Sequence, residues 1–81
     1  MNVRAQFFAQ LRDLAGVSEL DVDLPEHSTV ADLLGKIYAT KPDLRKQDAT
    51  ILFGVGVEFV DRNYQLQPND VIAIMPPVQG G

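Results

Sequence analysis

The sequence Val71-Ile72-Ala73-Ile74-Met75 runs directly into Pro76-Pro77-Val78-Gln79-Gly80-Gly81. The first of these segments is apolar on both faces of an extended chain, which is typical of a central strand rather than an edge. Pro76 and Pro77 predict the end of this strand, because neither has a backbone N–H and both favour a polyproline geometry. At roughly 3.3 Å per residue, residues 76–81 can project about 20 Å. We therefore predict a central last strand from which the chain leaves as an extended tail.

One earlier segment has the pattern of an amphipathic helix. Thr29 precedes it and Asp32 stands three residues later, a spacing that resembles a capping box. The apolar residues that follow have helical spacing and form one stripe: Val30, Leu33, Leu34, Ile37 and Tyr38. Pro42 disfavours helix at Lys41 and ends the pattern. This predicts a helix whose apolar stripe covers one face of a sheet.

Two strands are predicted ahead of this helix. Residues 3–9 alternate between apolar and polar, and so do residues 20–24 until Pro25 closes the second strand. Between them, residues 11–16 are too few for a stable helix and end in glycine. We predict one helical turn there, stopped by Gly16 in a left-handed conformation. The two strands are expected to form a hairpin.

Two further short strands are predicted after the helix. Residues 43–50 are polar and predict an irregular connection, whereas residues 51–55 are an apolar run that contains glycine and is consistent with a buried strand. Residues 58–60 resemble a brief return strand. Residues 66–70 predict a turn in which Asn69 takes a positive φ.

The order of these elements predicts the fold class. Two strands, one main helix and three more strands, with the most apolar strand last, indicate an α+β fold with a mixed sheet covered on one face. We identify it as a β-grasp, or ubiquitin-like, roll in which the first and last strands lie side by side. Residues 1–75 are the predicted domain and residues 76–81 the predicted tail.

Composition narrows the possible functions. The chain has 81 residues, 46% of them hydrophobic, which is enough for one compact domain. It has no cysteine and a single histidine, His27, so a disulfide framework, a thiol nucleophile and the usual zinc spacings are excluded. The net charge of −4 argues against binding of nucleic acid or an anionic membrane. No segment resembles a signal peptide or a membrane span, so we expect a soluble cytoplasmic protein.

With these elements in place, the chain resembles the small subunit of molybdopterin synthase, the MoaD family of ubiquitin-like sulfur carriers. The resemblance extends over the whole length, and its most specific part is the ending. The motifs that carry it are Phe7-Phe8-Ala9, Leu14-Ala15-Gly16, Leu33-Leu34, Leu66 with Asn69-Asp70-Val71, and Met75-Pro76-Pro77-Val78-Gln79-Gly80-Gly81. Two turns depart from the family pattern, at Gly54-Val55-Gly56 and at Asn69-Asp70, and each exchanges one residue that tolerates positive φ for another.

The resemblance implies a carrier cycle centred on Gly81. An adenylating enzyme that consumes ATP joins AMP to the Gly81 carboxylate, and a sulfur donor enzyme then displaces AMP to leave a thiocarboxylate. The tail, which is Pro76, Pro77, Val78, Gln79 and Gly80, enters the large catalytic subunit, where sulfur passes to the pterin precursor of the molybdenum cofactor. The resemblance also implies a heteromer, commonly two copies of each subunit. The carrier itself binds no cofactor and no metal and has no catalytic machinery of its own.

Three apolar residues are candidates for a partner-binding surface. The strand patterns leave Phe8, Phe59 and Met75 on the uncovered face of the sheet. Apolar residues that are exposed singly need no functional explanation. Together, however, they favour a surface for the activating enzyme and the large subunit, as the resemblance implies. His27 is expected on a solvated turn with no catalytic role.

Other functions remain open from the sequence alone. The same chemistry can serve thiazole synthesis for thiamine, or conjugation to protein lysines as in ubiquitin. A function of a different class is a plain interaction module whose Gly80-Gly81 ending is chemically idle.

Overall fold

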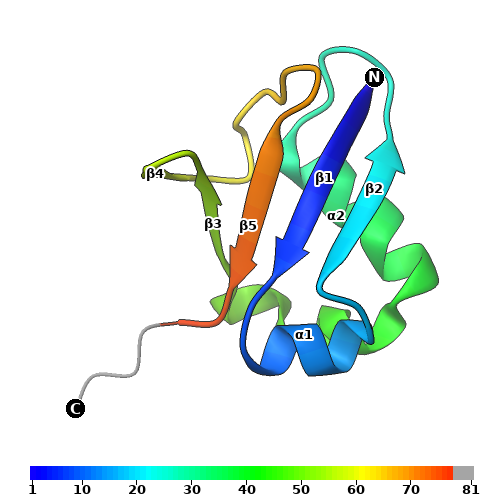
Figure 1. The fold of residues 1–81 in the computed structure, drawn as a ribbon, viewed down its shortest axis with the longest axis vertical. Helices are drawn as coiled ribbons and strands as arrows, with labels where there is room; N and C mark the ends of the chain where they lie inside the picture. Colours follow the sequence, from blue (N-terminus) through cyan, green and yellow to red (C-terminus); the bar gives the residue numbers. More distant parts are fainter. Residues whose placement is uncertain (78–81) are drawn as a thin grey trace.

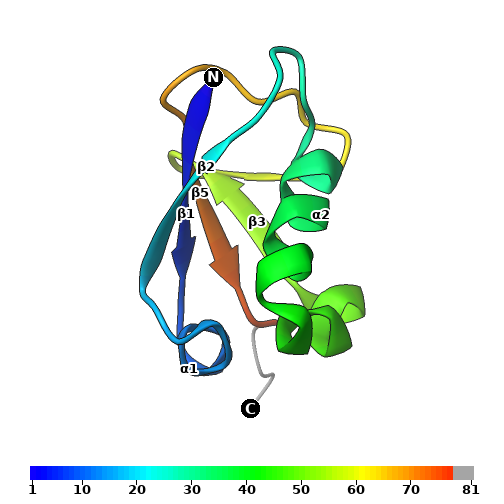
Figure 2. The same ribbon diagram turned by 90° about the vertical axis from the view of Figure 1, so that its right-hand side faces the viewer.

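The computed structural model describes residues 1–77 and shows one five-stranded sheet with its longest helix packed on one face and a short helix at the end of the strands (Figure 1; Figure 2). In chain order the elements are β1 (Asn2–Phe7), α1 (Gln10–Ala15), β2 (Glu19–Asp23), α2 (Val30–Thr40), the 3₁₀ helix η1 (Pro42–Thr50), β3 (Leu52–Val55), β4 (Glu58–Val60) and β5 (Val71–Met75). The strand order is β2-β1-β5-β3-β4. Strands β1 and β5 are parallel neighbours, and the other pairs are antiparallel. The predicted mixed sheet, with the first and last strands side by side, is confirmed.

Helix α2 begins with the predicted cap. The backbone N–H of Asp32 donates to Thr29 Oγ1 (3.4 Å), and the backbone N–H of Thr29 donates to Asp32 Oδ2 (2.9 Å). The helix ends at Thr40, just before Lys41 and Pro42, as expected. Its whole apolar stripe is buried against the sheet.

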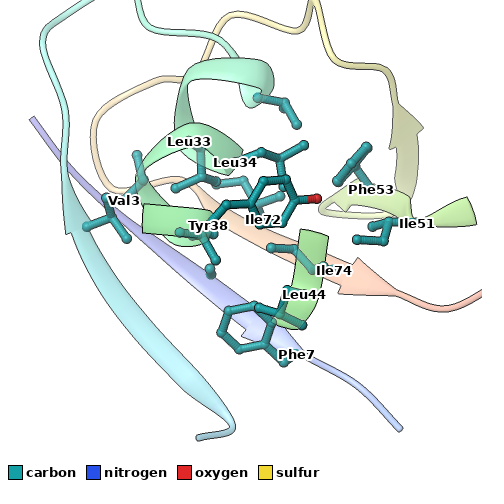
Figure 3. Packing of buried hydrophobic residues seen from close by; sticks show 14 of the residues in the cluster. Val3, Phe7, Leu33, Leu34, Tyr38, Leu44, Ile51, Phe53, Ile72 and Ile74 are labelled. Atoms are coloured by element: carbon teal, nitrogen blue, oxygen red, sulfur yellow. The ribbon is translucent and has the colours of Figure 1, made fainter. Parts of the chain in front are cut away.

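The core lies between α2, η1 and the inner face of the sheet (Figure 3). Side chains from α2, η1 and the sheet meet there. The largest fully buried ones include Leu33 and Ile37 of α2, Leu44 of η1, and Ile72 and Ile74 of β5. Burial of each such side chain contributes on the order of 2 kcal/mol, so this layer holds the helices on the sheet.

Two parts of the sequence prediction are wrong. Residues 43–50, expected to be irregular, belong to η1, which starts at Pro42 and is fixed to the core by Leu44, whose side chain is 1% exposed. The first strand ends at Phe7 rather than Ala9, because Ala9 takes a φ of 52° and a ψ of −134° and leads into α1. The predicted positive φ angles at Gly16 (77°) and Asn69 (68°) are confirmed.

The two faces of the sheet differ. In β5, Ile72 and Ile74 point into the core, whereas Val71 is 41% exposed and Ala73 and Met75 are only partly buried. The prediction of a central strand is correct, but the second apolar face of β5 is not covered by any element within residues 1–77. We call this side of the sheet the uncovered face.

Candidate functional site

The chain leaves the sheet beside two other elements. Met75, the last residue of β5, is in register with Leu52, the first residue of β3. On the other side, the backbone N–H of Phe8 donates to the carbonyl oxygen of Ile74 (3.2 Å). Both views place α1 and η1 at this end of the molecule, which we call the tail-exit end (Figure 1; Figure 2). The predicted tail therefore starts from a position fixed by strand pairing on both sides.

Most of the predicted tail lies outside the described residues. Pro76 and Pro77 are described and are partly buried, with no strand assigned to them. Val78, Gln79, Gly80 and Gly81 are not among residues 1–77. Their roles as the tail and the reactive end stay predictions.

The predicted partner surface lies on the uncovered face. Phe59 is 71% exposed and Phe8 is 44% exposed, values that are high for phenylalanine in a folded domain. Phe59 and Met75 line the same shallow hollow of about 180 Å³. Phe8 does not line this hollow; it follows β1, on the other side of β5. The structure thus brings two of the three predicted residues directly together.

Gly54 shapes this hollow and was not among the predicted site residues. It is in register with Ala73 on one side and with Phe59 on the other. A Cβ at Gly54 would lie 3.2 Å from Met75 Cε and 3.8 Å from Ala73 Cβ. The signal in the sequence was a glycine inside an apolar strand, which often marks a close approach.

The other half of the uncovered face is polar. Across β1 and β2, Arg4 Nε donates to Asp21 Oδ1 (2.9 Å) and Gln6 Nε2 donates to Glu19 Oε2 (3.0 Å). The hydrogen bond to Asp21 and its negative charge raise the pKa of Arg4 above its ordinary value. The uncovered face is therefore divided into an apolar half on β5, β3 and β4 and a charged half on β1 and β2.

A hydrogen-bonded group braces the tail-exit end. The Tyr38 hydroxyl donates to Asp48 Oδ1 (2.6 Å), and Arg62 Nη1 donates to the same oxygen (2.9 Å). The hydrogen bond from Tyr38, together with Arg62, holds the pKa of Asp48 below its ordinary value. Burial, reinforced by Asp48, raises the pKa of Tyr38 well above its ordinary value. This group ties α2, η1 and the segment after β4 together.

The structure also places the acidic side chains and the single histidine. Within residues 1–77, no three His, Asp or Glu side chains gather in a way that could hold a metal ion. His27 lies on the turn before α2, where its Nδ1 is 2.7 Å from Gln65 Nε2. In the described part of the chain, no helix is long and apolar enough to cross a membrane.

Known proteins resemble this chain over its full length. The molybdopterin synthase sulfur carrier subunit of Chlamydomonas reinhardtii is 34% identical, with 100% of both chains covered. The solved structure of a putative molybdopterin converting factor, subunit 1, from Pyrococcus furiosus is 30% identical with a TM-score of 0.86, covering 96% of this chain and 99% of that one.

A third similar protein has been solved together with another subunit. It comes from a protein-protein complex of subunits 1 and 2 of molybdopterin-converting factor from Helicobacter pylori 26695. The similarity covers 100% of both chains at 23% identity and a TM-score of 0.70, and it supports the β-grasp fold alone. The model of the ThiS family matches residues 5–81. The chain therefore belongs to the ThiS family, and its identity of 34% over the full length to a molybdopterin synthase sulfur carrier subunit agrees with the resemblance found in its sequence motifs.

Proposed function

We propose that this chain is the sulfur-carrier small subunit of a molybdopterin synthase. One observation carries the proposal: the central strand β5, paired on both sides, runs directly into the Pro76-Pro77-Val78-Gln79-Gly80-Gly81 ending. Full-length similarity to a molybdopterin synthase sulfur carrier subunit supports the same function. The folded body is recognised by partners, and the end of the chain carries the reactive group.

Gly81 carries the chemistry in this proposal. A Gly81 carboxylate oxygen attacks the α-phosphorus of ATP on an adenylating enzyme, which releases pyrophosphate and leaves an acyl-adenylate. A sulfur donor enzyme then delivers sulfide-level sulfur (HS⁻) to the acyl carbon: the C–S bond forms, the C–O bond to AMP breaks, and a thiocarboxylate remains. Glycine suits this step because it has no Cβ to hinder attack or to block a narrow channel. The carrier binds no cofactor, and the activating enzyme consumes the ATP.

The partners follow from this cycle. A large catalytic subunit receives Pro76, Pro77, Val78, Gln79 and Gly80 in its active site and takes sulfur from Gly81 for the pterin precursor. The apolar half of the uncovered face, with Phe59 and Met75 at the hollow, binds the large subunit and the adenylating enzyme together with Phe8, which lies on the other side of β5. We place this cycle in the cytoplasm, where ATP and the partner enzymes are available.

Intact-mass measurement tests the proposal. The chain is incubated with ATP, its adenylating enzyme and a sulfur source. The expected result is the mass change for one oxygen replaced by sulfur, located on Gly81 by fragmentation. A variant with one alanine appended after Gly81 is the control and should stay unmodified. An unchanged mass for the unmodified sequence would contradict the proposal.

A second assay identifies the destination of the sulfur. The sulfurated chain is mixed with the large subunit and the pterin precursor, and in parallel with a thiazole-forming enzyme and its substrates. Product in the first mixture alone is expected. Product only in the second would instead support a role in thiamine synthesis.

A further inference from the structure

The positive charges of this acidic chain are concentrated in one segment. Four of the seven Lys and Arg residues lie within residues 36–46, at Lys36, Lys41, Arg45 and Lys46, together with one acid, Asp43. Four cations against one carboxylate give this segment a net charge of +3. Because the whole chain has a net charge of −4, the remaining residues carry −7.

Most cations in this part of the molecule lack a carboxylate partner. Arg4 makes an ion pair of 2.9 Å with Asp21 on β2, and at the tail-exit end Arg62 makes one of 2.9 Å with Asp48. Among residues 1–77, by contrast, no carboxylate lies within ion-pair distance of Lys36, Lys41, Arg45 or Arg12. The one pair in the basic segment, Lys46 with Asp43, is 3.9 Å long and highly exposed. Such a pair neutralises little charge.

Arg12, Lys41, Arg45 and the weakly paired Lys46 lie at the tail-exit end, whereas Lys36 lies on α2 in a hollow that it shares with residues 24–28. Arg12 is on α1, which packs against η1, and both helices lie where β5 ends (Figure 1; Figure 2). We call Arg12, Lys41, Arg45 and Lys46 the cationic end.

The backbone of the cationic end is held in place. Leu44 is buried in the core between Lys41 and Arg45, and the backbone N–H of Lys41 donates to the carbonyl oxygen of Ile37 (2.7 Å). The Arg45 guanidinium lies 5.3 Å from the centroid of the Tyr38 ring. The carbonyl groups at the C-terminus of α2 favour a positive charge at Lys41. Arg45 and Lys46 follow this helix, so the same effect does not account for them. Fixed cations lose less conformational freedom when they bind an anionic surface.

We propose that the cationic end contacts a carboxylate-rich rim around the active-site entrance of the large subunit. This rests on the function proposed above. The chain leaves the sheet at this end, so the entrance that receives the tail faces these cations. A bound nucleotide is a poor candidate, because the reacting end lies up to about 20 Å further along the tail. Nucleic acid is disfavoured by the charge of −7 on the rest of the surface.

Association kinetics of two variants with equal net charge test this proposal. Arg45→Gln/Lys46→Gln removes two positive charges from the cationic end. Gln65→Glu/Gln67→Glu adds two negative charges to the segment between β4 and β5, which lies beside the N-terminus at the opposite end of the molecule (Figure 1). Both variants have a net charge of −6. Their association rate constants with the large subunit are measured by stopped flow in low and high salt, after thermal unfolding confirms that both are folded.

A local contact and a general charge effect give different results. The first variant should associate about fivefold more slowly at low salt, with the difference lost at high salt, while the second keeps the wild-type rate. Equal slowing of both variants, or faster association of the first, would overturn the proposal. If the wild type forms no complex with the large subunit at any salt concentration, the proposed function fails together with this inference. If the wild type binds and both variants associate at the wild-type rate, only the inference fails.

Discussion

Gly54 and Met75 approach each other so closely on the uncovered face that a Cβ on Gly54 would lie 3.2 Å from Met75 Cε. The missing side chain at Gly54 therefore leaves the space in which the end of Met75 lies. Both residues line the hollow of about 180 Å³ beside Phe59. The depth of the proposed partner surface thus depends on one glycine in β3.

Gly54→Ala should weaken partner binding without unfolding the protein. The new methyl group displaces the flexible end of Met75 and fills part of the hollow. We expect about a tenfold weaker Kd for the large subunit. The free energy of unfolding should change by less than about 1 kcal/mol, because alanine also removes the entropic cost of glycine in a strand. Calorimetric titration and urea unfolding measure the two effects.

Gly35→Ala is the matched control. A Cβ at Gly35 in α2 would meet no atom within 4 Å. Alanine there should stabilise the helix by about 1 kcal/mol and leave the Kd unchanged. If both variants bind like the wild type, the hollow is not part of the partner surface.

Ala9 connects β1 to α1 in a strained conformation. Its φ of 52° and ψ of −134° are accessible to glycine but costly for alanine, by about 1–3 kcal/mol. Ala9→Gly relieves this strain, and the greater freedom of glycine in the unfolded chain offsets part of the gain. We expect a net stabilisation of about 1 kcal/mol, measured by urea unfolding.

The control for this effect is an alanine in ordinary helical geometry. Ala39 is exposed on α2, and Ala39→Gly should destabilise the protein by about 1 kcal/mol. Destabilisation by both substitutions would show that Ala9 is not strained. The change in unfolding free energy should be stabilising for Ala9→Gly and destabilising for Ala39→Gly. Because the two signs are opposite, a general cost of introducing glycine cannot produce both results.

The sequence was sufficient to predict the elements with a clear apolar pattern. The stripe of α2 predicts its own burial, because its period of 3.6 matches a helix, and the continuous apolar run of β5 predicts a central strand. Helix η1 was missed because Leu44 is its only buried residue and one residue has no period. The strand end at Phe7 was missed because the pattern continues to Ala9, while the backbone turns there.

The candidate site could be predicted only where local sequence determines it. The exposed positions of Phe8 and Phe59 follow from the strand alternation, whereas the role of the Gly80-Gly81 ending stays a prediction. The bonds of Tyr38 and Arg62 to Asp48 join residues that are 10 and 14 positions apart on different elements. Such contacts depend on how η1 packs against α2, which the sequence pattern did not predict. The gathering of free cations around the tail exit depends on the same packing.

Asp48 should give the protein a specific response to acid. Its folded pKa is below its ordinary value of about 3.9, so it contributes stability above that pH and loses the contribution as pH falls through the folded pKa. Asp48→Asn keeps an acceptor for Tyr38 but has no charge for Arg62. The difference in unfolding free energy between wild type and variant should therefore shrink as the pH falls below the ordinary pKa of an aspartate and through the lower folded pKa of Asp48.

Urea unfolding as a function of pH measures this difference. The Asp48 side chain is 39% exposed, so solvent screening keeps the effect at about 1 kcal/mol or less. Asp43→Asn is the control, because its ion pair with Lys46 is 3.9 Å long and exposed. A difference between wild type and Asp48→Asn that stays constant from neutral pH to pH 2 would show that the Arg62 pair contributes no charge-dependent stability.

Phe59 should be the energetic centre of the apolar half of the uncovered face. It is 71% exposed on an edge strand and lines the hollow with Met75, so its ring is available to a partner and contributes little to the core. Phe59→Ala should weaken binding of the large subunit by about tenfold to a hundredfold, with a small change in thermal stability. Val17→Ala is the matched control, since Val17 is 37% exposed and precedes β2 at the opposite edge of the sheet. Equal Kd values of Phe59→Ala and Val17→Ala for the large subunit would mean that partners recognise another face. Sulfur transfer by Phe59→Ala with the wild-type KM for the carrier would lead to the same conclusion.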